Sequence, residues 1–510
     1  MTQALRRDAV VAVIGAGAMG AGIAQVAAQA GHPVRLFDVK PGAAEQAVAG
    51  VRRSLEQLVA KGKLALGDAA DASERLQQSD TLWALSDSAL VIEAVAERLD
   101  VKRALFAELE GIVAPECILA TNTSSLSVTA VAAGLQRPGR LVGMHFFNPA
   151  PRMALVEVVS GLDTEPEVAD IVHATALAWG KQPVHAKSTP GFIVNRVARP
   201  FYAEALRLLN EQAADPATID AVMREAGGFR MGPFELMDLI GHDVNLAVTR
   251  SVFDAYFGDP RFTPSLIQQA LVDGGRLGRK SGRGFFDYAE GAAAPAVSNE
   301  PAAALPATIA VRTGSASGQI LATRLQAAGI AFREEGGIAD DTCLLRADDA
   351  RVYLTDGRSA TQCAADSAWP ATVMADLALD LATARRIALA PSDMCSGEAF
   401  QAAVGVFQAA GFAVSRFADV PGLAVMRTVA MLANEAADAV NQGVCNAAAA
   451  DTAMRLGVNY PRGPLAWADQ VGPRHILAVL DNLARLYGED RYRASPLLRR
   501  VAASGRSLHS

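Results

Sequence analysis

The chain has 510 residues, too many for one hydrophobic core, because cores stop growing near about 250–300 residues. Its 47 basic and 54 acidic residues give a net charge of −7 without a basic block, which argues against nucleic acid and membranes as partners. The five cysteines are scattered, odd in number and without CxxC spacing. This pattern favours a reducing compartment and argues against disulfides or a zinc site.

An apolar stretch near the N-terminus allows two interpretations. Arg6 and Arg7 precede residues 9–34, where His32 offers the only possible charge, so the stretch resembles a signal peptide or a membrane span. Repeated glycines would weaken a spanning helix. A strand, a glycine turn and a helix explain the same residues, so we expect a cytoplasmic protein.

The N-terminal region predicts a parallel sheet with helices between its strands. Residues 10–14 form an apolar β-branched run typical of a buried strand, and a helix over 21–30 and a strand over 34–38 complete a βαβ unit. Further strands are predicted at 89–93, 118–121 and 141–145, with helical stretches such as 102–112 between them.

The remainder of the chain contains an internal repeat. Residues 196–271 are almost wholly helical, and the Ala- and Pro-rich residues 289–308 have no periodic pattern. The run Pro190-Gly191-Phe192-Ile193-Val194 aligns with Pro421-Gly422-Leu423-Ala424-Val425, an offset of 231 positions (421 less 190). The same offset pairs Arg196 with Arg427, Glu204 with Glu435, Asp220 with Asp451, Gly232-Pro233 with Gly463-Pro464, Asp238 with Asp469, Gly241 with Gly472 and Tyr256 with Tyr487. We therefore expect a duplicated helical domain.

These patterns predict an α/β Rossmann-type domain, an all-α domain, a degenerate α/β region and a second all-α domain. The expected boundaries are 1–188 for the Rossmann-type domain, 189–288 for the helical domain, 289–308 for a linker, 309–415 for the degenerate region and 416–510 for the second, non-catalytic helical copy. In the degenerate region, residues 314–318 lack the G-x-G-x-x-G spacing, so we expect one dinucleotide per chain.

A G-x-G-x-x-G motif lies where the first predicted strand meets its helix. Gly15, Gly17 and Gly20, with Ala18 and Met19 between the last two, suit a tight turn, close approach of the backbone to a pyrophosphate and helix–strand packing. Asp38 ends the second strand, where its carboxylate can accept the ribose hydroxyls and repel a 2′-phosphate. The sequence therefore favours NAD over NADP.

His145 closes another predicted strand, and ligands of parallel sheets lie beyond the carboxyl ends of the strands. A neutral imidazole there can take the proton of an alcohol as hydride leaves the carbon. Glu157, on the strand that returns after residues 148–153, could fix the tautomer. A single histidine is more often structural, but the carboxylate and the dinucleotide motif together favour a base.

Two further polar groups have alternative interpretations. The run Thr121-Asn122-Thr123-Ser124-Ser125 follows a strand, where its hydroxyls either face the crevice or cap a helix. Asn195 opens the first long helix of the second domain, where it either caps the helix or donates to a substrate oxygen.

The chain resembles the (3S)-3-hydroxyacyl-CoA dehydrogenases, in particular the long form found with bacterial phenylacetate degradation. The motifs that carry the resemblance lie within residues 9–288 and include GAGAMGAGIA, EAVAERLDVK, TNTSSLS, HFFNPAP, LVEVV, STPGFIVNRV and GRLGRKSGRGF. It implies reversible NAD-dependent oxidation of a 3-hydroxyacyl-CoA, with a 3-hydroxyadipyl or 3-hydroxybutyryl ester as candidate substrates.

The resemblance also implies roles for individual residues. His145 would be the base, Glu157 its orienting partner, and Ser124 and Asn195 the groups that hold the 3-oxygen. The positions that match NAD contacts are Asp38, Glu97, Lys102, Ser124, Asn148 and Lys280, and those that match contacts with CoA are Ser54 and Lys61. Members with one helical domain form dimers, so the duplication implies either a homo-oligomer or a monomer with an internal pseudo-dimer.

Three alternatives remain. A related dehydrogenase could act on a free hydroxy acid, and Ser54 and Lys61 favour a CoA ester over that substrate. A non-catalytic NAD-binding protein would be expected to lack His145 or Glu157, and both are present. The C-terminal half could serve as a docking module, although nothing in its sequence marks a docking surface.

Overall fold

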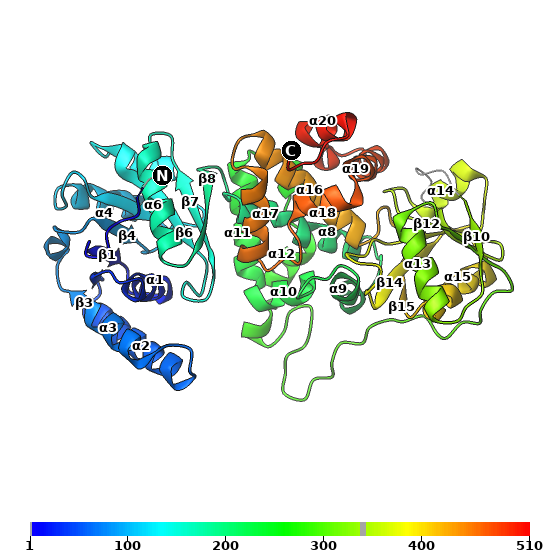
Figure 1. Ribbon diagram of the computed structural model, residues 1–510, viewed down its shortest axis with the longest axis horizontal. Coiled ribbons are helices and arrows are strands. Elements are labelled where there is room, and N and C mark those ends of the chain that lie inside the picture. Colours follow the sequence, from blue (N-terminus) through cyan, green and yellow to red (C-terminus); the bar gives the residue numbers. More distant parts are fainter. Residues whose placement is uncertain (1–2, 337–342) are drawn as a thin grey trace. The chain divides into compact units, whose positions relative to one another are not determined.

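The computed structural model describes residues 3–336 and 343–510 (Figure 1). Its internal contacts divide the chain into two units. Unit 1 comprises Met1–Arg196 and Gln442–Val458, and unit 2 comprises Val197–Asn441 and Asn459–Ser510. Unit 1 therefore takes a short segment from the second helical copy.

Unit 1 contains an eight-stranded sheet of order β3-β2-β1-β4-β5-β6-β7-β8. Its strands are β1 (Val11–Ile14), β2 (Val34–Phe37), β3 (Leu76–Ser79), β4 (Leu90–Glu93), β5 (Ile118–Thr121), β6 (Leu141–Phe146), β7 (Leu155–Ser160) and β8 (Gln182–Lys187). Neighbouring strands run parallel except β6 and β7. The predicted strands are confirmed, and their apolar runs are buried because helices cover the sheet.

The helices of unit 1 are α1 (Ala18–Gln29), α2 (Ala43–Ala60), α3 (Leu66–Arg75), α4 (Leu99–Glu110), α5 (Val128–Ala132), α6 (Pro166–Ala178), α7 (Val194–Val197) and α17 (Ala447–Gly457), with short 3-10 turns η1 (Leu82–Leu85) and η2 (Pro138–Arg140). The predicted helices over 21–30 and 102–112 exist as α1 and α4, but each begins earlier than predicted. In α1 the cause is that the last residues of the glycine motif already form the first helical turn. Helices α2 and α3 form a hairpin between β2 and β3 (Figure 1).

Unit 2 contains helices from both copies of the repeat. The first copy supplies α8 (Arg199–Asn210), α9 (Pro216–Glu225), α10 (Pro233–Ile240), α11 (His242–Ala255), α12 (Leu266–Asp273) and the turns η3 (Pro260–Phe262) and η4 (Arg279–Ser281). The second copy supplies α16 (Val425–Asn441), α18 (Pro464–Val471), α19 (Pro473–Tyr487), α20 (Pro496–Ser504) and η5 (Asp490–Tyr492). Gly241 and Gly472 have φ of 98° and 103°, so the repeat preserves backbone conformation as well as residue type.

A second sheet, of order β10-β9-β11-β12-β13-β14-β15, lies within unit 2. Its strands are β9 (Ile309–Arg312), β10 (Arg333–Glu335), β11 (Cys343–Ala347), β12 (Ala350–Leu354), β13 (Thr372–Ala375), β14 (Arg386–Pro391) and β15 (Ala413–Arg416), and its helices are α13 (Ala316–Ala327), α14 (Ala360–Ser367) and α15 (Gly397–Ala409). Strand β11 is antiparallel to both of its neighbours, which the sequence did not predict. Residues 292–308 form no helix or strand and lead into this sheet (Figure 1).

The two helical copies pack against each other within unit 2. Helix α16 of the second copy lies along α8 of the first. The fully buried Arg427 on α16 donates from Nε to Glu204 Oε2 on α8 at 2.8 Å, and its Nη1 donates to Glu211 Oε2 at 2.9 Å. Helix α9 of the first copy packs on β14, where Arg386 Nε donates to Glu225 Oε2 at 3.1 Å.

A segment of the second copy also completes unit 1. Helix α17 packs on β7 and β8, and the Lys187 amide donates to the Val444 carbonyl at 2.9 Å. A Cβ on Gly457 would lie 2.8 Å from Leu155 Cδ2, so α17 packs closely on the sheet at this position. Part of the duplicated domain is therefore integral to the fold of the first sheet.

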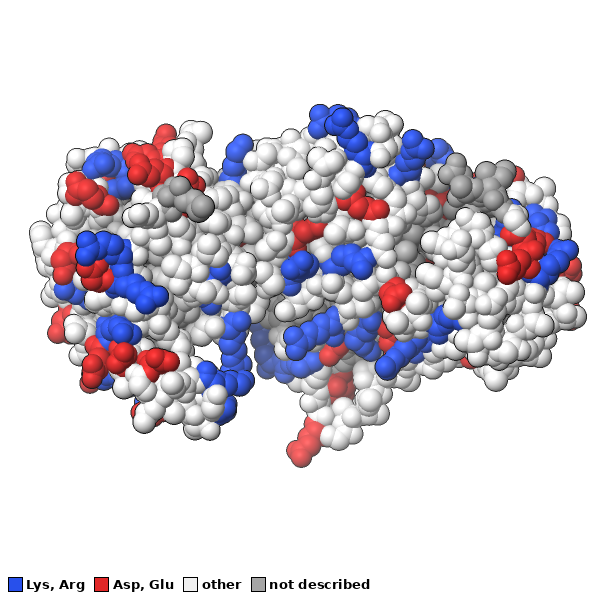
Figure 2. Space-filling view, viewed as in Figure 1, with Lys and Arg blue, Asp and Glu red and all other residues white. Residues whose placement is uncertain are grey.

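The structure also shows how charge and hydropathy are distributed. On the face shown in Figure 2, basic and acidic side chains are interspersed with wide uncharged areas. Within the described ranges, no helix is both long enough and apolar enough to cross a membrane. None of the five cysteines, all of which lie in the described ranges, forms a disulfide.

Candidate active site

The glycine motif forms the turn between β1 and α1, and each glycine meets a different requirement. Gly15 has a φ of 101°, and a Cβ there would lie 2.5 Å from the Ala94 carbonyl oxygen. A Cβ on Gly20 would lie 1.7 Å from the Gly15 carbonyl oxygen, so Gly20 allows close packing of helix on turn. Gly17 caps α1 and faces open space, with nothing within 4 Å of an added Cβ. The turn thus fits the pyrophosphate of a dinucleotide at the positive end of α1.

Asp38 follows β2 and lies against this turn. Its Oδ2 accepts a hydrogen bond from the Ala16 amide at 2.6 Å, and its Oδ1 accepts from the Lys40 amide at 2.8 Å. A cavity beside the turn is lined by residues of the motif, of α1 and α2, and by Pro151; Ser54 of α2 lies in its wall. The arrangement places a carboxylate where the ribose of a bound dinucleotide is expected.

His145 and Glu157 face each other across the antiparallel pair β6 and β7. The His145 Nδ1 and Glu157 Oε2 atoms are 2.7 Å apart, and both side chains are buried. The His145 ring also lies against Phe147 and Phe192, with centroid distances of 4.5 and 5.8 Å. In the part of the chain that the structure describes, Nε2 of His145 has no hydrogen-bond partner, so this nitrogen is available to a substrate.

Glu157 is held in place by the start of α7. Its Oε1 accepts hydrogen bonds from the amides of Ile193 and Val194, both at 3.0 Å. The preceding Gly191 and Phe192 have positive φ, which turns these amides toward the carboxylate. Glu157 therefore serves two structural tasks, since it orients the histidine and also caps a helix.

The loop after β5 wraps around Glu97. The carboxylate of Glu97 accepts hydrogen bonds from the Thr123 hydroxyl at 2.6 Å and from the amides of Ser124 and Ser125 at 2.9 and 3.0 Å. Burial acts to raise the pKa of Glu97, but these hydrogen bonds and the charge of Lys102 outweigh it and hold the pKa below its usual value. The hydroxyls of the loop thus position a carboxylate, a role that the sequence analysis had not considered.

Lys102 is buried rather than exposed in the crevice. Its Nζ lies 2.5 Å from Glu93 Oε1 and 3.3 Å from Glu97 Oε2. Glu93 ends β4 and also accepts from the Thr121 hydroxyl at 2.7 Å. Sequence reasoning missed Glu93, although a carboxylate that closes an apolar buried strand is itself a signal of a polar partner.

The carboxyl edge of the sheet is continuous from the glycine turn to His145. Asn122, after β5, accepts through Oδ1 a hydrogen bond from the Phe146 amide at 2.8 Å. The turn after Asn148 reaches α1, because a Cβ on Gly22 would lie 3.0 Å from Pro151 Cδ. Asn148 itself is exposed. The predicted cofactor turn and the predicted base therefore share one edge of the sheet, joined by short contacts.

The position of Asn195 differs from the one expected from the sequence. It does not open the long helix, because it lies in the separate short helix α7, which ends just before α8 begins. Its Nδ2 is 3.4 Å from the Ser124 carbonyl oxygen. The structure therefore brings Asn195 and Ser124 together within unit 1, and both belong to the same unit as His145.

The remaining predicted contacts are Ser54, Lys61 and Lys280. Ser54 is on α2, and Lys61 is exposed at the end of that helix. Lys280 lies in unit 2, in η4, where its Nζ is 2.5 Å from Asp243 Oδ1. Their contacts with CoA and NAD stay predictions.

The second sheet lacks the predicted base and its carboxylate partner at the corresponding positions. The offset of 231 pairs His145 with Asp376 and Glu157 with Ala388 (376 less 145; 388 less 157), and the Asp376 amide donates to the Ala388 carbonyl at 3.0 Å. Asp376 accepts hydrogen bonds from the amides of Ala424, Val425 and Met426 at 2.8–3.0 Å. A carboxylate that accepts hydrogen bonds from the start of the following helix is thus retained, but it follows β13, the counterpart of β6, whereas Glu157 lies on β7. No histidine occupies the position that corresponds to His145.

The glycine motif yields a prediction with an internal control. Gly17→Ala is expected to leave thermal stability unchanged, because the new methyl group enters open space, and to weaken NAD binding by occupying the approach of the pyrophosphate. Gly20→Ala is expected to lower stability as well, because its Cβ collides with the backbone. Melting temperatures and NAD titrations of the two variants would check this, and equal losses of stability would contradict it.

Family models match most of the chain. The "3-hydroxyacyl-CoA dehydrogenase, NAD binding domain" matches residues 10–189, and the "3-hydroxyacyl-CoA dehydrogenase, C-terminal domain" matches twice, over 191–288 and 422–508. The "3-hydroxybutyryl-CoA dehydrogenase reduced Rossmann-fold domain" matches residues 352–421. The duplicated helical domain predicted from the repeat is therefore confirmed.

Individual known proteins are similar to this chain, some over nearly its full length and others over about its first half. A 3-hydroxyadipyl-CoA dehydrogenase of Escherichia coli K12 is 46% identical over 96% of this chain and 97% of its own length. A probable 3-hydroxybutyryl-CoA dehydrogenase of Bacillus subtilis is 43% identical over 55% of this chain and 97% of its own length. The crystal structure of a 3-hydroxybutyryl-CoA dehydrogenase from E. coli K12 superposes with a TM-score of 0.89 at 45% identity, covering 98% of this chain and 100% of that one.

Proposed function

The chain belongs to the 3-hydroxyacyl-CoA dehydrogenases, which are NAD-dependent oxidoreductases, and from this premise we propose how its residues carry out the reaction. His145 is the general base that removes the hydroxyl proton of a (3S)-3-hydroxyacyl-CoA. The observation that carries this role is the 2.7 Å contact between His145 Nδ1 and Glu157 Oε2. With Nδ1–H donating to the carboxylate, Nε2 presents its lone pair to the substrate.

Glu157 stabilises the imidazolium that forms as the proton is taken. Two backbone amides already hold the other oxygen of Glu157, so the carboxylate needs little reorganisation during the reaction. Ser124 and Asn195 hold the 3-oxygen of the substrate. Their proximity within unit 1 supports this assignment.

Bound NAD would accept the hydride from C3, and the residues of this chain that fit it are the glycine turn and Asp38. The open space at Gly17 and the carboxylate against the turn support NAD rather than NADP, because a 2′-phosphate would meet the charge of Asp38. Glu97, Lys102, Asn148 and Lys280 are further proposed contacts, of which Lys102 would act through its ion pair with Glu97.

The second copy is proposed to serve structure rather than chemistry. Asp376 and Ala388 replace the base and its partner, and α16 and α17 pack on α8 and on the first sheet respectively. One active site per chain and an internal pseudo-dimer follow from this arrangement. We also propose a cytoplasmic location, on the basis of cysteines that are scattered and form no disulfide among the described residues.

The substrate class can be tested by comparing 3-hydroxyadipyl-CoA and 3-hydroxybutyryl-CoA with their free acids. We expect turnover with the esters and little with the acids. Lys61→Ala is expected to raise KM for the ester by about tenfold with kcat retained, since a hydrogen bond to a charged group contributes about 1.5 kcal/mol or more. Steady-state NADH formation measures both constants.

The matched control is Lys63→Ala, which removes a neighbouring exposed lysine that we assign no role. Equal rates with ester and free acid would contradict a CoA-dependent reaction and favour a hydroxy acid dehydrogenase. Equal effects of the two lysine variants would contradict the role of Lys61.

A further inference from the structure

A partly open cavity with polar and apolar groups in its lining lies between the two helical copies within unit 2. Its volume is about 300 Å³, and it lies between α8 and residues 261–268 of the first copy and residues 487–491 of the second. Its polar lining includes four arginines, namely Arg199, Arg207, Arg261 and Arg491. The carboxylates in the same lining are Glu211 and Glu489.

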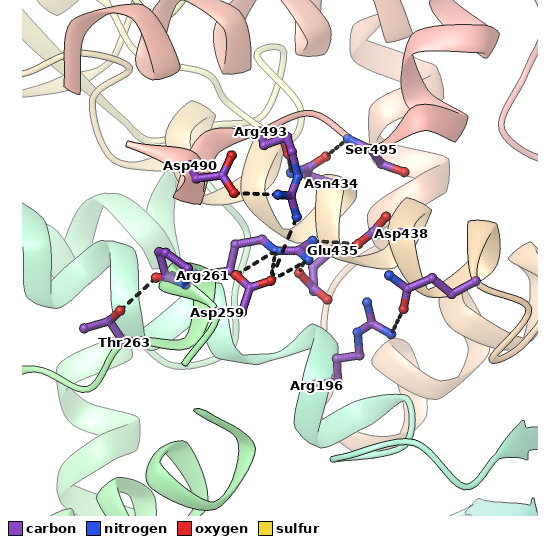
Figure 3. A network of polar contacts seen from close by, with 12 residues as sticks. Arg196, Asp259, Arg261, Thr263, Asn434, Glu435, Asp438, Asp490, Arg493 and Ser495 are labelled. Carbon is purple, nitrogen blue, oxygen red and sulfur yellow. Dashed lines mark hydrogen bonds and ion pairs between the residues drawn. The ribbon is translucent and has the colours of Figure 1, made fainter. Parts of the chain in front are cut away.

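Most of these charges are already neutralised by neighbours. Glu211 accepts two hydrogen bonds from Arg427, at 2.9 and 3.1 Å. Arg261 pairs with Asp438 at 2.7 Å, Asp259 at 3.0 Å and Glu435 at 3.3 Å (Figure 3). Glu489 is the remaining carboxylate of the lining, whereas three further arginines, Arg199, Arg207 and Arg491, line the same cavity.

Arg491 is the exception among these buried groups. It is 5% exposed, yet it makes no hydrogen bond to any of the described residues. Its single ion pair there is a long one, 3.7 Å from Nε to Glu489 Oε2. Burial lowers the pKa of Arg491, and the charges of Glu204 and Glu489 offset only part of that effect. A buried guanidinium without hydrogen bonds is costly unless a ligand supplies them.

The internal repeat explains how Arg491 lost one of its acidic partners. Arg261 in η3 corresponds to Arg491 in η5, at an offset of 230 because one residue is missing before η5 (491 less 261). Asp438, the partner of Arg261, corresponds at the offset of 231 to Arg207 (438 less 207). The interface between the two copies therefore contains an Arg–Asp pair in one half, formed by Arg261 and Asp438, and two arginines at the equivalent positions in its other half.

The hydrogen-bond donors of Arg207 are not all satisfied within the fold either. Its Nη2 donates to Glu489 Oε2 at 2.8 Å and its Nη1 to the Tyr492 hydroxyl at 3.3 Å, while its buried Nε has no partner among the described residues. Glu489 thus pairs with both Arg207 and Arg491, and the charge of the buried Glu204, which Arg427 already binds, also acts on both. Arg199, 6% exposed, adds a third positive charge to the same wall.

We propose that this cavity is a binding site for a small oxyanion, a phosphate or a short dicarboxylate, held by Arg207 and Arg491 and separate from the catalytic residues of unit 1. The planar guanidinium groups match carboxylate and phosphate oxygens in a bidentate manner. The anion takes the place that the Asp438 carboxylate fills in the other half. Its binding joins η5 of the second copy to α8 of the first.

The test is isothermal titration calorimetry of the full-length protein with inorganic phosphate and with succinate, at an ionic strength held constant with chloride. We expect saturable binding of at least one anion and a rise in melting temperature of about 2–5 °C near saturation. Binding of phosphate alone or of succinate alone supports the site and identifies the anion. Absence of saturable binding for both overturns it.

Arg207→Asp recreates the Arg–Asp pair of the other half, so it is expected to weaken binding by more than tenfold while the anion-free melting temperature holds or rises. Arg506→Asp makes the same charge change at an exposed position and is expected to bind as the wild type does. Arg491→Gln is a second variant that removes the guanidinium without hydrogen bonds, in case Arg207→Asp does not fold. Equal losses in Arg506→Asp and in the cavity variants would overturn the proposal, since only general charge would then matter.

Discussion

His145→Gln is expected to lower kcat by about 10²–10⁴-fold, the range that general base catalysis supplies. Glutamine has a similar size and can still contact Glu157, but it cannot take up the proton. NAD affinity should survive, because the glycine turn and Asp38 are formed by other strands of the sheet. Stopped-flow or steady-state NADH formation measures the first quantity, and a fluorescence titration measures the second.

His173→Gln is the control for this variant. His173 stacks on His185 at a ring distance of 4.4 Å and takes no part in the proposed site. It should keep full turnover. Near-normal turnover of His145→Gln would refute the assignment of the base, whereas a parallel loss of NAD binding would point to a structural role for His145.

Removal of residues after 290 is expected to change the oligomeric state of the chain or to cause aggregation. The truncated chain loses α16, whose Arg427 pairs with Glu204, and loss of the partner of a buried charge alone costs about 3–5 kcal/mol. It also loses α17, which covers β7 and β8. We expect aggregation, or dimers in which two truncated chains restore the missing contacts. Size-exclusion chromatography with light scattering and an activity assay would distinguish these results.

A cleavable version of the full chain is the matched control. A protease site placed within the exposed residues 292–294 would cut the connection without removing either copy. Because α8 and α16 pack together within unit 2, the cleaved halves should stay associated and active. A truncated protein that is soluble, unchanged in oligomeric state and fully active would contradict the internal pseudo-dimer.

Local patterns in the sequence determined much of the first sheet and of the site. The glycine motif requires positive φ at Gly15 and close packing at Gly20, and both requirements are properties of short segments. His145 and Glu157 could be paired in advance, because a short turn between two strands places them opposite each other. The repeat was equally visible, since Gly, Pro and Asp mark turns and caps that an unchanged fold preserves.

Only the tertiary structure decided which polar side chains contact residues that are distant in the sequence. The burial of Lys102 against Glu93 and the use of Glu97 as the centre of a hydroxyl loop arise from contacts between separate strands and helices. The role of Asp376 depends on the register of β13 and β14, which no local pattern specifies. The incomplete pairing of Arg491 arises only when the two copies pack together, because Glu489, its one ion-pair partner among the described residues, also accepts a hydrogen bond from Arg207 of the first copy. Sequence reveals which groups a segment offers, but packing determines which of them find partners.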